Sequence, residues 1–307
     1  MAQPAPIALF VYKRLQHTRR TVDALRANDL AAESDLHIFS DAPKTADASE
    51  SVRAVRDYIR TITGFRQVRI VEQPRNLGLA QSIISGVTDV CNRAGRVIAL
   101  EDDLVTSESF LSYMNQGLDL YAHDDRVASI HGYCYPITKV ELPRTFFLRG
   151  ADCWGWGTWQ RSWQHFEPDG RKLLVQLRGR GLEHQFDLDG AMPFTRMLQE
   201  QISGKNDSWA IRWHAACFLQ DRVTLYPGRS LVDNIGNDAS GTHGCATDVY
   251  SNQLARGAQI WERVPIVESQ QARAAFADFL RGPSRTLFQR LVARVFGRPG
   301  APIGERT

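Results

Sequence analysis

Val97-Ile-Ala-Leu-Glu-Asp-Asp-Leu104 is the stretch that decides the fold of this chain. An apolar run in it leads directly into three consecutive carboxylates, Glu101, Asp102 and Asp103. A short apolar run that ends in polar residues is typical of a buried strand. Three acids at the end of such a strand repel one another, which costs stability unless a cation binds there. We therefore expect a buried strand that ends at a cation site.

The residues before this stretch alternate between apolar runs and segments of helical periodicity. The apolar runs predict strands over residues 7–12, 36–41, 68–72 and 96–100. Apolar residues at helical spacing predict helices over residues 18–30, 50–63 and 79–94. This order indicates a doubly wound parallel sheet, which binds ligands at the carboxyl ends of its strands. The site candidates are the polar residues that follow these strands: Tyr12, Asp41, Arg75 and Glu101 to Asp103.

Composition narrows the class of protein. The chain has 307 residues and is 43% hydrophobic, which suits one large α/β domain or two small ones, and its formal net charge of +3 disfavours a nucleic-acid partner. Five cysteines without a CxxC pair exclude a zinc ribbon and a dense disulfide framework. The N-terminus lacks the pattern of a signal peptide, and no apolar run reaches the ~18 residues of a membrane span. We expect a cytoplasmic protein.

The acidic turn, Glu101 to Asp103, has two interpretations. Carboxylates are hard oxygen ligands that suit Mn²⁺ or Mg²⁺, which often share their shell with substrate phosphates and act as Lewis acids on a diphosphate leaving group. Alternatively, the three acids form a solvated loop or the first turn of a helix, where acidic side chains are favourable.

The order of three motifs favours the cation site. Ser40-Asp41, Arg75-Asn-Leu-Gly-Leu79 and Leu100-Glu-Asp-Asp-Leu104 together resemble the GT-A glycosyltransferases. They are most similar to family-2-like bacterial sugar transferases and to the N-acetylglucosaminyltransferase I group. The resemblance implies a GT-A, Rossmann-like fold: a mixed, mainly parallel sheet flanked by helices, with a C-terminal helical tail. It also implies transfer of a hexose or N-acetylhexosamine from a nucleotide-diphosphate sugar to a glycan or lipid-linked acceptor in bacterial surface polysaccharide synthesis.

The resemblance assigns roles to the candidates. Asp103 is the metal ligand, and Glu101 and Asp102 contact the sugar or ribose, although Glu101 departs from a strict Asp-X-Asp pattern. Tyr12 borders the base and ribose, and Asp41 accepts a hydrogen bond from one of them. From the residues themselves, Asp41 could equally be a turn residue before a proline.

Arg75 and Gly78 complete the expected donor pocket. An arginine can donate two hydrogen bonds to a phosphate or a base, and a glycine lets the backbone approach a ligand closely. Arg75 could also be an ordinary surface ion-pair residue. The chain has neither a GxGxxG nor a P-loop motif, which argues against a dinucleotide-binding or P-loop protein.

Two tryptophan-containing segments are candidates for the sugar and the acceptor. In the first, Trp154, Gly155 and Trp156 offer flat rings that stack on sugars, although they could instead form a tightly packed core cluster. In the second, Asp207 precedes Trp209 and Arg212. An inverting transferase needs a carboxylate to deprotonate the acceptor hydroxyl, and the resemblance gives that role to Asp207. The alternative for Asp207 is a plain helix N-cap.

The C-terminal part contains a polar loop and a basic tail. Residues 228–248 are rich in Gly, Asn, Asp and Ser and predict a long loop, in which His243 could complete the metal shell or simply be solvated. We predict a catalytic domain over residues 1–265, with a nucleotide-binding half (1–104) and an acceptor half (105–265). Residues 266–307 form an amphipathic tail that lies on an anionic membrane surface, peripheral to the inner face, or docks on the core or a partner.

Three other functions fit part of the pattern. A retaining transferase would use the same pocket. A nucleotidyltransferase that makes the sugar donor would show a glycine-rich basic motif after the first strand, which Tyr12-Lys-Arg-Leu15 lacks. A non-catalytic carbohydrate-binding protein would account for the tryptophans but not for the parallel strands and the acidic turn.

Overall fold

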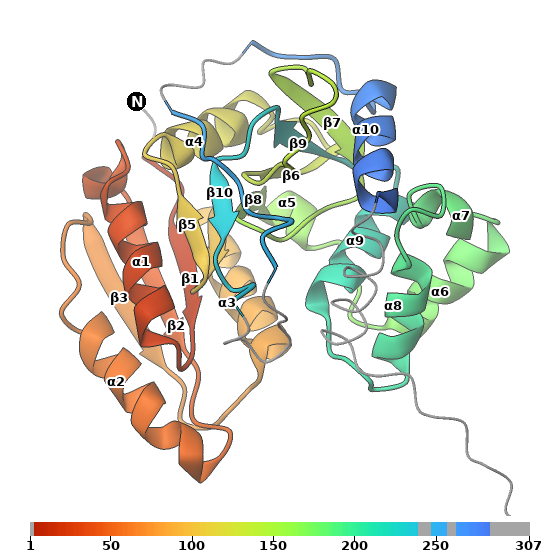
Figure 1. The fold of residues 1–307 in the computed structure, drawn as a ribbon. Helices are drawn as coiled ribbons and strands as arrows, with labels where there is room; N and C mark the ends of the chain where they lie inside the picture. Colours follow the sequence, from red (N-terminus) through yellow and green to blue (C-terminus); the bar gives the residue numbers. More distant parts are fainter. Residues whose placement is uncertain (1–2, 239–246, 257–261, 283–307) are drawn as a thin grey trace, which may run out of the picture.

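An eight-stranded mixed sheet forms the centre of the protein (Figure 1). The computed structural model describes residues 3–238, 247–256 and 262–282. The strand order is β3-β2-β1-β4-β8-β6-β9-β7. The strands are β1 (Ile7–Val11), β2 (Asp35–Ser40), β3 (Gln67–Glu72), β4 (Arg96–Glu101), β6 (Val127–His131), β7 (Thr145–Arg149), β8 (Trp156–Trp159) and β9 (Val223–Pro227).

Helices cover both faces of this sheet. The longer ones are α1 (Leu15–Arg26), α2 (Ser49–Ile59), α3 (Leu79–Ala94), α4 (Phe110–Leu120), α9 (Trp209–Leu219) and α10 (Gln270–Arg281). The shorter ones are α5 (Gln160–Trp163), α6 (Gly170–Gly179), α7 (Glu183–Phe186) and α8 (Phe194–Ile202). A separate two-stranded ribbon is formed by β5 (Leu104–Thr106) and β10 (Val232–Asn234).

The topology confirms the expected fold class, a mixed α/β protein with a mainly parallel sheet. Strands β3, β2, β1 and β4 are parallel neighbours, as the alternation of strand and helix predicts. Strand β8 is antiparallel to both β4 and β6, while β6 and β9 are parallel and β7 closes the sheet antiparallel to β9. Strands β1, β2, β3, β4 and β6 therefore all end at the same edge of the sheet.

The central strands are buried on both faces, so their side chains alternate between two cores. In β1, Leu9 packs with helices α1, α2 and α4, whereas Phe10 packs with α3, α5 and α9. The second core holds a tryptophan cluster in which Trp156 lies 5.3 Å from Trp209 and 5.7 Å from Trp163, measured between ring centroids. Helix α9 also packs on α6 and α8, which lie beside the sheet (Figure 1).

Several elements differ from the sequence-based expectation. The Gly-Trp block contains a central strand, β8, whose Gly157 lies so close to β4 that an added Cβ would come within 3.1 Å of the Val97 carbonyl oxygen. Residues 183–219 are divided among helices α7, α8 and α9, and the first break lies where Leu188, Asp189 and Gly190 all have positive φ angles. Pro193, which follows these residues, also prevents the helix from continuing.

The C-terminal segment is partly integrated into the core. Helix α10 begins after a Ser269 N-cap and buries Phe276 against Phe146 and Tyr226. This part of the predicted tail is thus docked on the outer strands β7 and β9 rather than free. The basic residues 283–307 lie outside the described residues. Within the described ranges, no helix is long and apolar enough to span a bilayer.

Candidate functional site

The acidic turn lies at the edge where the parallel strands end. Glu101 is the last residue of β4, and Asp102 and Asp103 connect it to β5. Neighbouring strand β1 leads into Tyr12 at this edge, and β2 leads into Asp41. The structure therefore brings these five expected residues to one edge of the sheet, as the doubly wound pattern predicts.

Arg14 pairs with two of the three acids of the acidic turn. Its guanidinium Nη2 donates to Asp102 Oδ1 and, over 2.7 Å, to Asp103 Oδ2. The carboxylate of Asp102 also accepts from the Tyr12 backbone N–H at 3.4 Å, and Thr21 Oγ1 donates to the Asp102 carbonyl at 2.9 Å. Sequence reasoning missed Arg14; its place just after the first strand was the available signal.

One arginine does not offset three acids. Burial raises the pKa of the Glu101 carboxyl most, and the charges of Asp103 and Asp102 raise it further. Burial likewise raises the pKa of Asp102, an effect that Arg14 partly opposes. Both shifts arise because excess negative charge is held in a poorly solvated place. A bound proton or a further cation would therefore relieve the excess negative charge of the acidic turn.

The carboxylates of the acidic turn suit a cation that is also bound by phosphate oxygens. Among the described residues there is no group of three or more His, Cys, Asp or Glu side chains arranged around one metal position. Mg²⁺ and similar ions are commonly held by only one or two carboxylates together with phosphate oxygens and water. Asp103, with 15% of its side chain exposed against 6% for Asp102, is the more accessible of these two carboxylates.

The ribbon of β5 and β10 covers the acidic turn. The Ile235 N–H donates to the Asp103 carbonyl at 2.9 Å, which fixes the start of the following loop against the turn. At Gly236 an added Cβ would come within 2.1 Å of Asp103 Oδ2. The predicted polar loop thus begins with an ordered strand and a close backbone approach. His243, the second expected metal ligand, lies outside the described residues.

Asp41 organises the loop that precedes α3. Its Oδ1 accepts from the N–H groups of Ala42 and Leu77, at 2.8 and 2.9 Å. Its Oδ2 accepts from Asn76 Nδ2 at 3.0 Å and from the Gly78 N–H at 2.9 Å. Two bonds to each oxygen occupy the lone-pair directions of the carboxylate. A direct bond to a nucleotide stays a prediction, and it would require one of these bonds to be exchanged.

The other residues of the expected donor pocket are more accessible. Gly78 has φ = +78°, a conformation that favours glycine, and it precedes α3 directly. Arg75 is exposed in the same loop. The Tyr12 hydroxyl accepts from the Lys44 N–H at 2.9 Å, which joins the loops after β1 and β2.

The tryptophan candidates separate into buried and accessible residues. Trp156 and Trp209 are 1% and 4% exposed and pack against each other, so in this structure both belong to the core. Trp154, which precedes Gly155, is half-buried, and its backbone N–H donates to His131 Nε2 at 3.0 Å. Because β8 enters the sheet from the binding edge, Trp154 lies at that edge. Of these rings, Trp154 is the better placed to contact a sugar.

Asp207 precedes α9 at the same edge of the sheet. Helix α9 leads through a tight turn into β9, which runs parallel to β6, so the helix N-terminus lies where the strands end. The N-cap is Ser208 rather than Asp207, because its side chain accepts from the Ile211 N–H. The Asp207 side chain is 72% exposed and is held by Arg212 Nη2 at 3.0 Å. Arg212 is buried and bonds only to protein oxygens among its described contacts.

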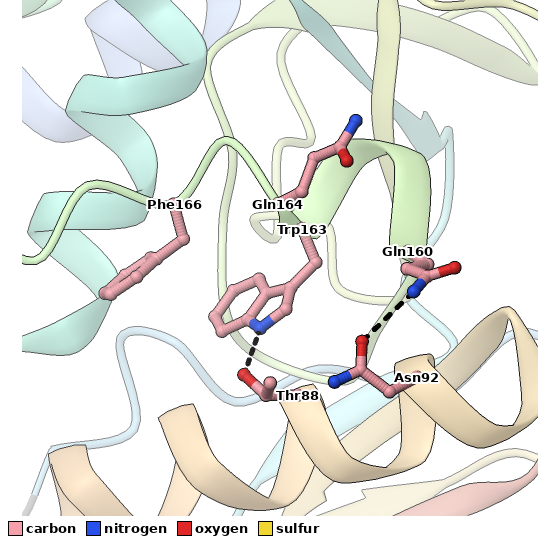
Figure 2. A pocket seen from close by; sticks show the side chains of 6 residues that line it. All are labelled: Thr88, Asn92, Gln160, Trp163, Gln164 and Phe166. Carbon is pink, nitrogen blue, oxygen red and sulfur yellow. Dashed lines mark hydrogen bonds between the residues drawn. The ribbon is translucent and has the colours of Figure 1, made fainter.

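A cavity of about 300 Å³ lies away from this edge (Figure 2). It is lined by α3, α5 and the residues that follow: Thr88, Asn92, Gln160, Trp163, Gln164 and Phe166. Figure 2 shows the Trp163 indole N–H bonded to Thr88, and Gln160 bonded to Asn92. No lining side chain is ionisable, so this cavity offers no group for acid–base chemistry.

Comparisons with solved structures find distant likenesses. No family model and no curated protein matches the chain. A solved structure of the mannosyltransferase PcManGT from Pyrobaculum calidifontis, in complex with GDP-Man and Mn²⁺, is 12% identical with a TM-score of 0.37, covering 70% of this chain and 71% of that one. The crystal structure of S. aureus TarS is 9% identical with a TM-score of 0.30, covering 48% of this chain and 25% of that one. Likenesses this distant leave the function to be argued from the chain's own residues.

Proposed function

We propose that this chain is a metal-dependent glycosyltransferase that moves a sugar from a nucleotide-diphosphate donor to a hydroxyl group of an acceptor. The observation that carries the proposal is the acidic turn, three carboxylates at the end of β4 whose one ion-pair partner among the described residues is Arg14. Excess negative charge at the ligand-binding edge of a parallel sheet favours a bound cation, and a diphosphate is the substrate group that such a cation holds.

The loops around the acidic turn would hold the nucleotide. Tyr12 lies beside the acidic turn, and Asp41 shapes the loop that carries Arg75 and Gly78. These residues provide an aromatic ring, a cation and a glycine without a Cβ on the side of β1 and β2, which suits a base, a ribose and phosphates. When bound at Asp103, Mn²⁺ or Mg²⁺ would stabilise the negative charge that develops on the departing diphosphate.

Asp207 is proposed as the general base of an inverting transfer. Its carboxylate takes the proton of the acceptor hydroxyl, whose oxygen bonds to the anomeric carbon as the bond from that carbon to the diphosphate oxygen breaks. The exposure of Asp207 suits contact with an acceptor from solvent, and the bond to Arg212 orients the carboxylate. A retaining transfer would not need this base.

We extend the proposal to the acceptor and to the organisation of the chain. The acceptor is a glycan or lipid-linked intermediate of bacterial surface polysaccharide synthesis, and the donor sugar is a hexose or N-acetylhexosamine. Residues 1–104 bind the donor and residues 105–265 the acceptor. Helix α10 belongs structurally to the second part, so a membrane-binding role is proposed only for residues 283–307.

Product analysis of a panel of nucleotide sugars tests this proposal. With Mn²⁺ and no acceptor, the chain is expected to release a nucleoside diphosphate slowly from one donor, since water can replace the acceptor. A nucleotidyltransferase would instead form or consume pyrophosphate with a nucleoside triphosphate and a sugar phosphate. A carbohydrate-binding protein would turn over neither. Failure to release nucleoside diphosphate from any donor, with or without oligosaccharide acceptors, would contradict the proposal.

A further inference from the structure

Arg14 occupies the carboxylates that the proposed function gives to the metal–diphosphate group. One guanidinium nitrogen bridges Asp102 and Asp103, and it takes Asp103 Oδ2, the oxygen that faces Gly236. The guanidinium is a permanent cation. A divalent cation on the same oxygen would meet a full positive charge within contact distance. The two cations therefore compete for Asp103.

The arginine side chain is easier to move than the acidic turn. The backbone of the turn is fixed by Thr21, which donates to the Asp102 carbonyl, and by Ile235, which donates to the Asp103 carbonyl. The Arg14 side chain is 19% exposed and is attached by a long flexible stem. An exchange of cations thus requires a side-chain rotation of Arg14 and leaves the strands in place.

We propose that Arg14 is a positioning residue that holds the acidic turn in the absence of donor and is displaced from Asp103 by the metal ion. Once displaced, its guanidinium donates to the diphosphate of the metal-bound donor, since a guanidinium pairs with phosphate oxygens as readily as with a carboxylate. Arg14 would then make metal binding depend on the donor. This inference rests on the proposed function, because the diphosphate is the group that receives the arginine.

Binding of Mn²⁺ alone tests the displacement. Free Mn²⁺ is measured by electron paramagnetic resonance in titrations of the full chain, of Arg14→Gln and of Lys13→Gln. Lys13 is the exposed neighbouring cation and has no described bond to the acidic turn, so its variant controls for the loss of one positive charge. We expect Arg14→Gln to bind Mn²⁺ at least about tenfold more tightly than the unchanged chain, because no guanidinium has to leave. Lys13→Gln should change the affinity by less than about twofold, because exposed charges are screened. Equal or weaker Mn²⁺ binding by Arg14→Gln would overturn the inference.

Nucleoside diphosphate binding tests the second half of the exchange. At saturating Mn²⁺, Arg14→Gln is expected to bind UDP or GDP at least about tenfold more weakly than the unchanged chain, because a charge-assisted bond to the diphosphate is lost. Unchanged affinity would overturn the transfer of the guanidinium to the donor. If the unchanged chain binds no nucleoside diphosphate at all, the proposed function fails. The Mn²⁺ titration then still decides whether Arg14 competes with the metal ion for Asp103.

A second variant, Arg14→Lys, tests the displacement in case Arg14→Gln does not fold. Arg14→Lys keeps one positive charge but cannot bridge two carboxylates with a planar group. It should bind Mn²⁺ alone more tightly than the unchanged chain, by a smaller factor than Arg14→Gln. Mn²⁺ affinity equal to that of the unchanged chain, with an unchanged circular dichroism spectrum, would also contradict the displacement.

Discussion

Two aspartates at the binding edge differ in how many hydrogen bonds their carboxylates accept from the protein. The Asp41 carboxylate accepts four hydrogen bonds from the loops after β2 and β3, and it is 7% exposed. Asp103 has Arg14 as the partner of its carboxylate and remains more accessible. Asp41 therefore shapes the loop that precedes α3, whereas Asp103 is the aspartate that a ligand can reach.

Asp41→Asn tests the shaping role. An amide at this position places an NH₂ group opposite two donors, so the substitution should lower the free energy of unfolding by about 1–3 kcal/mol and weaken nucleoside diphosphate binding. Urea denaturation and calorimetry provide the two measurements. Asp47→Asn, at an exposed position in the same connection, is the control and should change neither. Full stability in Asp41→Asn would show that the four bonds are not needed.

Asp207→Asn tests the proposed base. The amide cannot accept a proton, so donor binding should persist while turnover with acceptor falls by about 10²–10⁴-fold. Asp169 caps α6 through its own side chain, and Asp169→Asn keeps a capping oxygen, so this variant should leave turnover unchanged. Near-normal turnover in Asp207→Asn would assign the base to another residue or to no residue.

At the scale of elements, the ribbon of β5 and β10 joins residues far apart in the sequence. It pairs Leu104 with Asn234 and brings Gly236 against the acidic turn. A polar, glycine-rich sequence predicts a loop here, and no local pattern predicts its register against β5. The contact depends on tertiary pairing, which is why the strand was missed.

Gly236→Ala tests whether this close approach matters. The new Cβ would press on the carboxylate of Asp103, so we expect at least about tenfold weaker Mn²⁺-dependent nucleotide binding with little loss of stability. Gly95→Ala is the matched control: Gly95 has φ = +76° at the end of α3, with no atom within 4 Å of the added Cβ. It should cost roughly 1 kcal/mol of stability and leave binding unchanged. Unchanged nucleotide binding in Gly236→Ala, with weaker binding in Gly95→Ala, would show that Gly236 has no role in the site.

The elements differ in how far local sequence predicts them. Strands β1 and β4 and helix α3 follow from apolar periodicity, and α3 has the predicted bounds, residues 79–94. Strand β8 was missed: Trp154, Gly155 and Trp156 were interpreted as a sugar platform or a packed core cluster, and Trp156 lies in the core. Arg14 was missed because its partners come from β4, and only the fold brings them together.

At the scale of the whole molecule, the two cores bury titratable side chains. His131, the last residue of β6, is fully buried beside Tyr133 and Tyr226, and burial lowers its pKa. The unfolded chain binds a proton below a pKa of about 6.5, whereas the folded chain resists it until a lower pH. The His131 contribution to stability is therefore present above that value and is lost as the pH falls through the window below it.

His131→Gln tests this contribution, because glutamine can still accept from the Trp154 N–H. Between pH 7 and pH 5 the free energy of unfolding of the unchanged chain should fall more steeply than that of the variant, by at most about 1.4 kcal/mol per pH unit. Urea denaturation at a series of pH values gives the two slopes. Parallel slopes would show that His131 does not titrate differently on folding.

Calorimetric titration of a nucleoside diphosphate, with and without Mn²⁺, tests the central claim most directly. The unchanged chain should bind UDP or GDP only when Mn²⁺ is present, and Asp103→Asn should lose that dependence together with most of the affinity. Asp89→Asn, which alters an exposed pair with Arg93 on α3, should behave like the unchanged chain. Binding that is absent in all conditions, or that is equally strong without Mn²⁺ and in Asp103→Asn, would contradict a metal-held donor on the acidic turn.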